Sequence, residues 1–455
     1  MENKNKLILL WFIIIFVPLF TLRLFQDEML YLNISRKALH LEFLPRSSLV
    51  FILTSPLMAF GSVDLRVFLP RAATAFVTLM DIILIYSIAK RYYGEKTGFL
   101  SSLMFLFSFV ALRYGARYTL EPWGTLFVLV TIYYFGEKPL TAALSIGLAF
   151  CARETWLTTY PFFLIYAWRK NRKEFPKILG VSALPIALNL LFMASISLYG
   201  SPLSYNARDA LKWGINNVVL RLARGWLEFV FAYLLIVIGF LYGVKKDKFH
   251  RDILLLVLPS IITLNGVNGF ILNGPFERYT FGPLALMSIF SGYGIIQLYN
   301  NLKSKTKLLN ILAVEKWVTL FLIAQFIFFN IAVLELSDIG AKGIQDYGYW
   351  YDREVFEILE EKADLEEFFV GTPHPALLGF ENWKWADRNI QKAVELDPDW
   401  LITFESWVNF RENPQEIEEL EIYSAGPYLL IHAKEEGAIK KYVVSSDLKL
   451  WKFRK

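Results

Sequence analysis

Cysteine is almost absent from the chain, because Cys151 is the single copy among 455 residues. An intrachain disulfide is therefore excluded. Since Cys151 lies in an apolar run, we expect a small packing residue rather than a nucleophile. Histidine is also scarce, with four copies and no CxxC or HExxH spacing. These absences argue against a structural zinc site and against a zinc peptidase of the HExxH type.

Apolar residues, in contrast, are abundant: they make up 55% of the chain, and phenylalanine alone occurs 39 times. Apolar runs of membrane-spanning length recur, which is typical of an α-helical polytopic membrane protein. The first run is too long for a signal peptide core and no small-x-small cleavage site follows it, so we interpret it as an anchor. About eleven spans are predicted, at 7–25, 66–89, 97–113, 118–135, 139–153, 155–168, 177–199, 226–244, 253–271, 279–298 and 316–335.

The net charge of +5 is modest, but the cations are unevenly placed. Lysine-rich loops alternate along the predicted spans and fall on one side of the membrane, which the positive-inside rule makes the cytoplasmic side, together with the N-terminus. The opposite loops hold mainly isolated arginines, and the forked arginine side chain is suited to phosphate. This assignment depends on dividing 139–168 into two spans, because one fused span would reverse every later loop.

The composition changes after Leu334, because the last part of the chain has no further span and is rich in Glu, Asp and Trp. We therefore expect a membrane domain over 1–335, with a first outer loop at 26–65, and a small extracytoplasmic α/β domain over 336–455. In the second domain the pattern predicts an amphipathic helix over 352–363. Strand patterns occur at 366–371, 400–404, 428–432 and 441–445.

An adjacent Asp27-Glu28 pair follows the first span, where a membrane helix meets water. Acids at such a place are costly to bury and suited to chemistry, so this pair is the principal catalytic candidate. The pair opens a segment with Leu30, Ile34 and Ala38 at helical spacing, which predicts an amphipathic helix in the interface plane. The alternative is that Asp27 only caps this helix.

The other outer loops supply further candidates. In RYGARYTLEP, 113–122, a helical loop would place Arg113, Arg117 and Glu121 on one face, and Glu121 is either catalytic or only a helix-start acid. Arg153-Glu154 in the next outer turn is either a binding group or a plain turn ion pair. Two later outer loops contain residues that could hold a phosphate or anchor the interface, namely Arg221, Arg224, Arg278 and Tyr279.

Two more sets of residues remain open. Asp81 lies well inside the second span, where an acid is a functional candidate by default, although we favour a hydrogen bond within the bundle. In the C-terminal domain, the loop-like stretch 372–385 contains His374, Trp383 and Trp385, which could stack on sugars or fill the core.

The order of these motifs resembles the GT-C superfamily of membrane glycosyltransferases, in the branch of protein O-mannosyltransferases and lipid A aminoarabinose transferases. The motifs are Asp27-Glu28-x-x-Tyr31, PRSSLVFILTSPLMAFG with the two spans after it, RYGARYTLEP, and ERYTFGPLAL at 277–286. They cover roughly residues 1–170 and 270–300. Glu121 stands where this branch commonly has Asp, and Arg153 where Lys is expected, which puts the role of the second acid in doubt.

The resemblance implies a glycosyltransferase that takes its sugar from a polyprenyl-phosphate donor, such as dolichyl phosphate mannose, at the outer membrane face, without a nucleotide cofactor. The acceptor would be a protein, lipid or glycan, and a single displacement would invert the anomeric configuration. Asp27, Glu28 and Glu121 are the expected catalytic groups, and Asp27 with Glu121 could also hold a divalent metal. The expected substrate-binding residues are Tyr31, Arg117, Arg153, Glu154, Arg221, Arg224, Arg278 and Tyr279.

The alternative function is a transporter or flippase of a lipid-linked anion, with the outer arginines and Asp81 along its pathway. Paired internal repeats are typical of transporters, and the sequence has none. Its polar residues also gather at the outer ends of the spans rather than along a path through the membrane. A receptor or scaffold is a third possibility, but a single anchor would serve it, and the remaining spans would then be unexplained.

Overall fold

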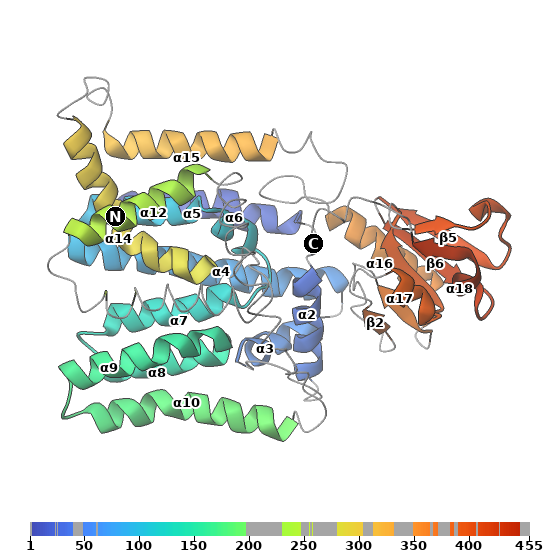
Figure 1. Ribbon diagram of the computed structural model, residues 1–455, viewed down its shortest axis with the longest axis horizontal. Coiled ribbons are helices and arrows are strands. Elements are labelled where there is room, and N and C mark those ends of the chain that lie inside the picture. The colour runs from blue at the N-terminus through green and yellow to red at the C-terminus, as the bar shows by residue number, and fades with distance from the viewer. Residues whose placement is uncertain are drawn as a thin grey trace.

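The computed structural model forms a bundle of helices with a sheet-containing domain at one end (Figure 1). Residues described by the structure are 2–22, 24, 26–39, 49–60, 62–196, 230–246, 254, 257, 280–303, 313–331, 349–364, 367–371, 383–385, 390–405, 408–426 and 428–445. The long helices of the bundle share one direction, and α2 crosses them at the end that faces the C-terminal domain (Figure 1).

The bundle contains α-helices and short π and 3₁₀ segments. The N-terminal segments are α1 (Glu2–Trp11), η1 (Phe12–Phe16), η2 (Val17–Phe20), α2 (Gln26–Leu39), α3 (Leu49–Thr54) and η3 (Ser55–Ala59). The middle segments are α4 (Val63–Tyr93), α5 (Glu95–Leu106), α6 (Phe109–Tyr114), α7 (Glu121–Tyr134), α8 (Pro139–Ala152), η4 (Glu154–Thr159), α9 (Tyr160–Lys170) and α10 (Phe175–Ile196). The last are α12 (Val230–Lys246), α14 (Phe281–Lys303) and α15 (Val314–Ile331).

Three described helical stretches are long and apolar enough to cross a membrane: Glu2–Phe20, Val63–Tyr93 and Phe281–Lys303. Shorter apolar helices occupy Leu49–Ala59, Pro139–Ala152, Phe175–Leu191 and Leu234–Val244. The predicted span 253–271 lies outside the described residues except for positions 254 and 257. A total of about eleven spans therefore stays a prediction.

The division of 139–168 into two helices is confirmed. Helix α8 ends at Ala152, Arg153 has an extended backbone with φ −152° and ψ 111°, and the chain then continues through η4 into α9. Tyr166 near the end of α9 stacks on Phe135, which precedes the start of α8. Helix α9 therefore runs back to the end of the bundle where α8 begins.

The predicted span 97–113 is interrupted. Helix α5 ends at Leu106, and α6 begins after Ser108, whose side-chain oxygen accepts a hydrogen bond from the N–H of Ala111. A serine in this position satisfies an N–H group that has no partner within the helix, so it favours a new helix start.

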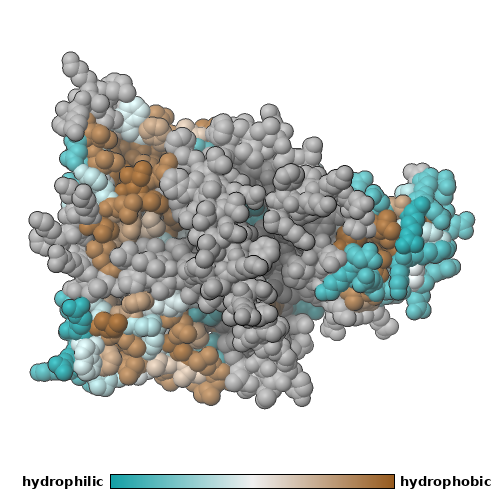
Figure 2. Space-filling view, viewed as in Figure 1, coloured by the Kyte–Doolittle hydropathy of each residue, from teal (hydrophilic) through white to brown (hydrophobic). Residues whose placement is uncertain are grey.

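The lysine-rich loops meet at one end of the bundle, which we call the lysine end. An ion pair of 3.1 Å between Lys90 and Glu95 closes the turn from α4 to α5. Two others join different loops: Arg91 with Glu137 and Lys96 with Glu315, both at 3.3 Å. An apolar surface lies between this polar edge and the polar C-terminal domain (Figure 2). The predicted clustering is therefore seen in the described loops, while the membrane side that each end faces stays a prediction.

The C-terminal domain has helices on a mixed sheet. Its elements are α16 (Tyr349–Lys362), β1 (Phe369–Gly371), β2 (Trp383–Trp385), α17 (Ile390–Glu395), β3 (Trp400–Phe404), β4 (Val408–Phe410), η8 (Pro414–Glu416), β5 (Leu420–Ala425), β6 (Tyr428–Ala433), α18 (Ala438–Tyr442) and β7 (Val443–Ser445). In its described part a five-stranded sheet has the order β2-β1-β3-β6-β5, and β4 pairs with β7. Strands β2, β1 and β3 are parallel, whereas β6 runs antiparallel to β3 and β5.

The predicted helix and all four predicted strand segments of this domain are confirmed within a few residues. The prediction of a loop over the whole of 372–385 was wrong at its end, because Trp383–Trp385 pairs with β1 as a parallel strand. Tryptophan has a high strand propensity, and W-K-W alternates with the period of a strand.

One apolar cluster, which we call the shared core, joins the C-terminal domain to the opposite end of the bundle from the lysine end, hereafter the domain end. From the bundle it includes Tyr31, Leu32, Val50, Phe51 and Tyr118, and from the C-terminal domain Val355, Phe356, Leu359, Phe369 and Trp400. The two parts of the chain are thus packed together by buried apolar contact rather than joined only in sequence.

Candidate functional site

The first polar candidates lie on α2 at the domain end of the bundle. Helix α2 begins at Gln26, so Asp27 is in its first turn rather than at the preceding cap. The buried residues Ile34 and Ala38 confirm the predicted apolar face of this helix. The side chain of Asp27 lies outside the described residues, and its catalytic role stays a prediction.

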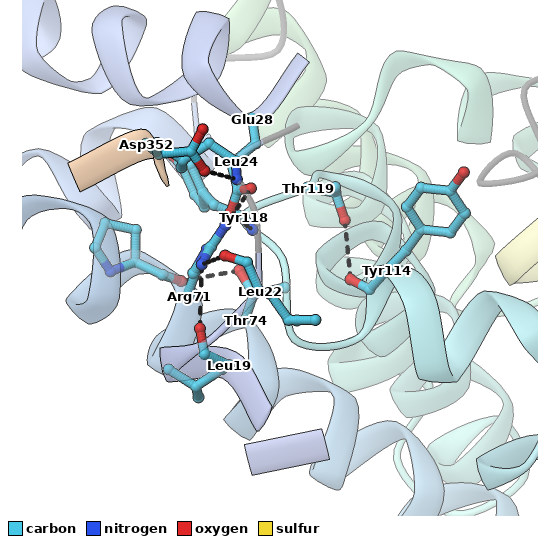
Figure 3. A network of polar contacts seen from close by, with 11 residues as sticks. Leu19, Leu22, Leu24, Glu28, Arg71, Thr74, Tyr114, Tyr118, Thr119 and Asp352 are labelled. Carbon is cyan, nitrogen blue, oxygen red and sulfur yellow. Dashed lines mark hydrogen bonds and ion pairs between the residues drawn. The ribbon is translucent and has the colours of Figure 1, made fainter. Parts of the chain in front are cut away.

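Glu28 forms a buried, two-pronged ion pair with Arg71 of α4 (Figure 3). The Nε and Nη2 groups of Arg71 donate to the two carboxylate oxygens of Glu28 at 2.6 and 2.8 Å. Nη1 of Arg71 also donates to the carbonyls of Leu19 and Leu22, at 3.1 and 2.6 Å. The N–H of Tyr118 donates to Oε1 of Glu28 at 2.9 Å. This network ties α2 to the end of the first helix, to α4 and to the segment before α7.

Tyr118 is also held through its hydroxyl group. Its oxygen lies 2.7 Å from Oγ of Ser35 and 2.6 Å from Oγ1 of Thr54, and those two hydroxyl groups are 3.0 Å apart. The ring of Tyr31 packs edge-on against Tyr118 with centroids 6.4 Å apart, and Tyr31 is 1% exposed. Tyr31 therefore lies among packed residues of this end of the bundle, and substrate binding by it stays a prediction.

A second buried carboxylate comes from the C-terminal domain. Asp352 in the first turn of α16 is fully buried, and its Oδ2 accepts a hydrogen bond of 2.7 Å from the N–H of Leu24 (Figure 3). Its Oδ1 accepts a bond of 3.0 Å from the hydroxyl of Tyr428 on β6. The C-terminal domain thus contacts the backbone three positions before Asp27.

Glu121 and Arg153 come together although they are far apart in the sequence. Nη2 of Arg153 lies 3.3 Å from Oε1 of Glu121, and Nη1 lies 3.6 Å from Oε1 of Glu154. Arg153 is 2% exposed, so this is a buried cation rather than a surface turn. Gly124 of α7 permits the close approach, because a Cβ there would lie 2.9 Å from Cβ of Arg153 and 2.5 Å from the ring of Trp156.

The predicted shared helical face of Arg113, Arg117 and Glu121 was wrong. Helix α6 ends at Tyr114, the residues up to Leu120 are not helical, and α7 starts at Glu121. Gly115 ends α6 with its N–H bonded to the carbonyl of Ala111, and Pro122 in the first turn of α7 favours a helix start there. Arg117 is nevertheless buried, at 1% exposure, in the same non-helical segment as Tyr118.

Asp81 does not make the expected hydrogen bond to any residue in the described part of the bundle. It is fully buried on α4, and neither of its carboxyl oxygens has a hydrogen-bond partner among the described residues. The nearby hydroxyl groups are used by the backbone: Thr78 donates to the carbonyl of Gly115 at 2.9 Å, and Ser102 donates to that of Ile82 at 3.1 Å. The predicted hydrogen bond within the bundle is therefore not seen among the described residues.

Several predicted residues lie outside the described residues. They are Arg221, Arg224, Arg278, Tyr279 and His374, together with the side chains of Trp383 and Trp385. Their predicted roles stay predictions.

Comparisons with known proteins agree with this architecture. A family model described as dolichyl-phosphate-mannose-protein mannosyltransferase matches residues 49–192. The crystal structure of ArnT from Cupriavidus metallidurans bound to undecaprenyl phosphate is similar with a TM-score of 0.57 at 12% identity, over 95% of this chain and 97% of that one. The Archaeoglobus fulgidus oligosaccharyltransferase tethered to an acceptor peptide is similar with a TM-score of 0.56 at 11% identity, over 89% of this chain and 68% of that one. No curated protein sequence matches.

Over most of its length the chain shares its fold with these two membrane proteins. The family-model match and the two structural matches agree with the resemblance drawn from the sequence motifs. The match to ArnT extends over nearly the full length of both proteins, so it includes the C-terminal domain as well as the bundle.

A metal site has little support from the described residues. No three His, Cys, Asp or Glu side chains among them are close enough to hold a metal ion. Glu121 is paired with Arg153, whose positive charge opposes a cation at the same carboxylate. A metal at Asp27 and Glu121 stays a prediction, and no step proposed below passes through it.

Two residues of the domain end were not predicted from the sequence. Arg71 was passed over as part of an apolar span, although a cation inside such a span signals a buried partner or a functional site. Asp352 had the appearance of an ordinary acid in the first turn of a helix, and nothing in the sequence near it points to Leu24.

Proposed function

We propose that the chain is a glycosyltransferase that moves a sugar from a polyprenyl-phosphate donor to a protein, lipid or glycan acceptor at the outer membrane face. The observation that carries the proposal is the GT-C fold along 95% of the chain, with buried arginines at the end of the bundle where Asp27 lies. The matched ArnT structure binds undecaprenyl phosphate, and the matched family is described by a dolichyl-phosphate sugar. Undecaprenyl phosphate and dolichyl phosphate are both polyprenyl-type lipid phosphates.

The proposed chemistry divides between a base and two buried arginines. Asp27 accepts the proton of the acceptor hydroxyl as that oxygen attacks the anomeric carbon. Arg117 and Arg153 bind the phosphate and stabilise the charge that develops on it as it leaves. Because the attack and the departure occur on opposite faces of the sugar, a single displacement inverts the anomeric configuration. Glu121 keeps Arg153 in place through their ion pair.

Replacing the proposed base tests this function. Asp27→Asn keeps the shape of the side chain but cannot accept the proton, so sugar transfer should fall by roughly 100- to 10,000-fold. The matched control is Asp64→Asn, because Asp64 is also an acid in the first turn of a helix at the domain end but is partly exposed. Purified protein, radiolabelled polyprenyl-phosphate sugars and a membrane extract supply the assay, and the labelled product identifies the acceptor.

Transfer by Asp27→Asn at the rate of the Asp64→Asn control would remove Asp27 from the mechanism. The transporter alternative would be favoured over the enzyme by a different outcome. In that outcome, labelled lipid crosses the membrane of reconstituted vesicles and no donor gives a labelled product.

A further inference from the structure

Asp352 is shared between two parts of the chain. A buried carboxylate needs hydrogen-bond donors, because its removal from water is otherwise costly. Only one of the two donors described above comes from its own domain, the hydroxyl of Tyr428 at 3.0 Å. The other is the backbone N–H of Leu24 in the bundle, at 2.7 Å. Removal of Asp352 therefore breaks a link between the domains.

Another acid of the same domain makes a useful contrast. Asp399 also accepts a 2.7 Å hydrogen bond from a backbone N–H, but the donor is Phe368 in the same domain. The two aspartates thus perform the same local task, and they differ in which part of the chain supplies the donor. Asp399 is therefore the matched control for Asp352.

The other side of position 27 is anchored to the bundle itself. Glu28 is held by Arg71 and by the N–H of Tyr118, as Figure 3 shows. The backbone is thus fixed at position 24 by the C-terminal domain and at position 28 by α4. Asp27 lies between these two anchors, and the apolar side chains of Tyr31 and Leu32 on the next turn of α2 lie in the shared core.

We propose that the C-terminal domain positions the catalytic segment of the membrane domain through Asp352. The hydrogen bond to Leu24 holds the chain in the register that presents Asp27, and Glu28 with Arg71 holds it from the other side. Asp352 is a positioning residue that touches neither the sugar nor the phosphate. The importance of this register for catalysis rests on the function proposed above, whereas the coupling between the domains does not.

Hydrogen exchange on the full-length protein in detergent tests the coupling without any assay of activity. In Asp352→Ala the amides of residues 22–30 should exchange about 10-fold faster or more, because a hydrogen bond to a charged group is lost. Asp352→Asn should show a smaller increase, since its amide oxygen can still accept from Leu24. Asp399→Ala should leave residues 22–30 unchanged and accelerate exchange near Phe368.

A second variant separates positioning from unfolding of the domain. Tyr428→Phe keeps the bond from Leu24 to Asp352 and removes the tie of Asp352 to the sheet, so exchange at residues 22–30 should rise less than in Asp352→Ala. Unchanged exchange there in Asp352→Ala overturns the proposal. The proposal is also overturned if Asp352→Ala and Tyr428→Phe both accelerate hydrogen exchange equally throughout residues 349–445. That result would mean that the whole C-terminal domain unfolds in both variants.

The transfer assay adds a kinetic readout. A displaced base slows the chemical step by about 100-fold, so Asp352→Ala should lower kcat while KM for the donor stays within about twofold. Asp352→Asn should recover most of kcat. If the wild-type protein transfers no sugar while the exchange results are as expected, the glycosyltransferase proposal fails and the domain coupling stands.

Discussion

Arg71 compensates a carboxylate that would otherwise be buried alone. Both Arg71 and Glu28 have side chains with 0% exposure, so replacing the arginine leaves Glu28 without its positive partner in a dry environment. Removal of one member of a buried pair costs about 3–5 kcal/mol. Arg71→Leu should therefore lower the free energy of unfolding by that amount, measured by denaturant unfolding of the purified protein in detergent.

An exposed ion pair provides the control. Arg353 pairs with Glu357 one helical turn away at 2.9 Å, and its side chain is 59% exposed. Water screens such a pair, so Arg353→Leu should cost less than about 1 kcal/mol. An equal loss of stability in both variants would contradict the prediction, because it would show that breaking the buried pair costs no more than breaking the exposed one.

At the same scale, the sequence identified most of the charged residues that gather at the domain end but not their partners. Glu121, Arg153 and Glu28 were predicted as site residues. The Arg153–Glu121 and Arg71–Glu28 contacts depend on how α4, α7 and α8 pack, which local patterns do not encode. The prediction that Arg113 and Arg117 share a helical face was wrong, because Gly115 caps the end of α6, between the two arginines.

Helices α12 and α14 show how small residues set the distance between elements. Gly294 of α14 lies against the backbone of Gly239 on α12, and a Cβ on Gly239 would lie 2.5 Å from the carbonyl oxygen of Ser291. Extra atoms at such a crossing force the helices apart, typically at a cost of about 1–3 kcal/mol. Gly294→Ala should therefore reduce the free energy of unfolding by that amount, measured in the same denaturant experiment.

Gly180 of α10 is the matched control for this crossing. It is also a helical glycine, but among the described residues no atom beyond its chain neighbours and its own helix backbone lies within 4 Å of a Cβ built there. Since alanine favours a helix over glycine by about 1 kcal/mol, Gly180→Ala should be neutral or stabilising. If Gly294→Ala leaves the free energy of unfolding unchanged, the two helices can move apart at no cost in stability, and the prediction fails.

Elements were predicted better than their ends. Helices lie within most of the predicted spans, because apolar runs of that length are hard to place elsewhere. Strands β4 and β5 were missed and β2 was taken for a loop, since three to six residues carry too short a pattern to stand out. Strand β4 pairs with β7, which is distant in the sequence, whereas β5 pairs with the adjacent strand β6.

The whole molecule is polarised, with the lysine-rich loops opposite the C-terminal domain, and its orientation in the membrane can be measured. In a Cys151→Ser background, Gly136→Cys places a thiol at the exposed turn between α7 and α8, and Asp364→Cys places one on the C-terminal domain. The positive-inside rule predicts that a membrane-impermeant maleimide labels Asp364→Cys in intact cells. Gly136→Cys should be labelled only after permeabilisation, and the reverse pattern would invert the predicted topology.

The shared core also limits which fragments of this protein can be studied in isolation. Val355, Phe356 and Leu359 of α16 are buried in the same cluster as Tyr31 and Phe51 of the bundle. A fragment containing only residues 349–445 would expose this apolar face of α16 to water, and an exposed apolar patch of that kind promotes self-association. Work on the isolated fragment therefore has to retain α2 and α3 in the same polypeptide, or supply an amphiphile that takes their place.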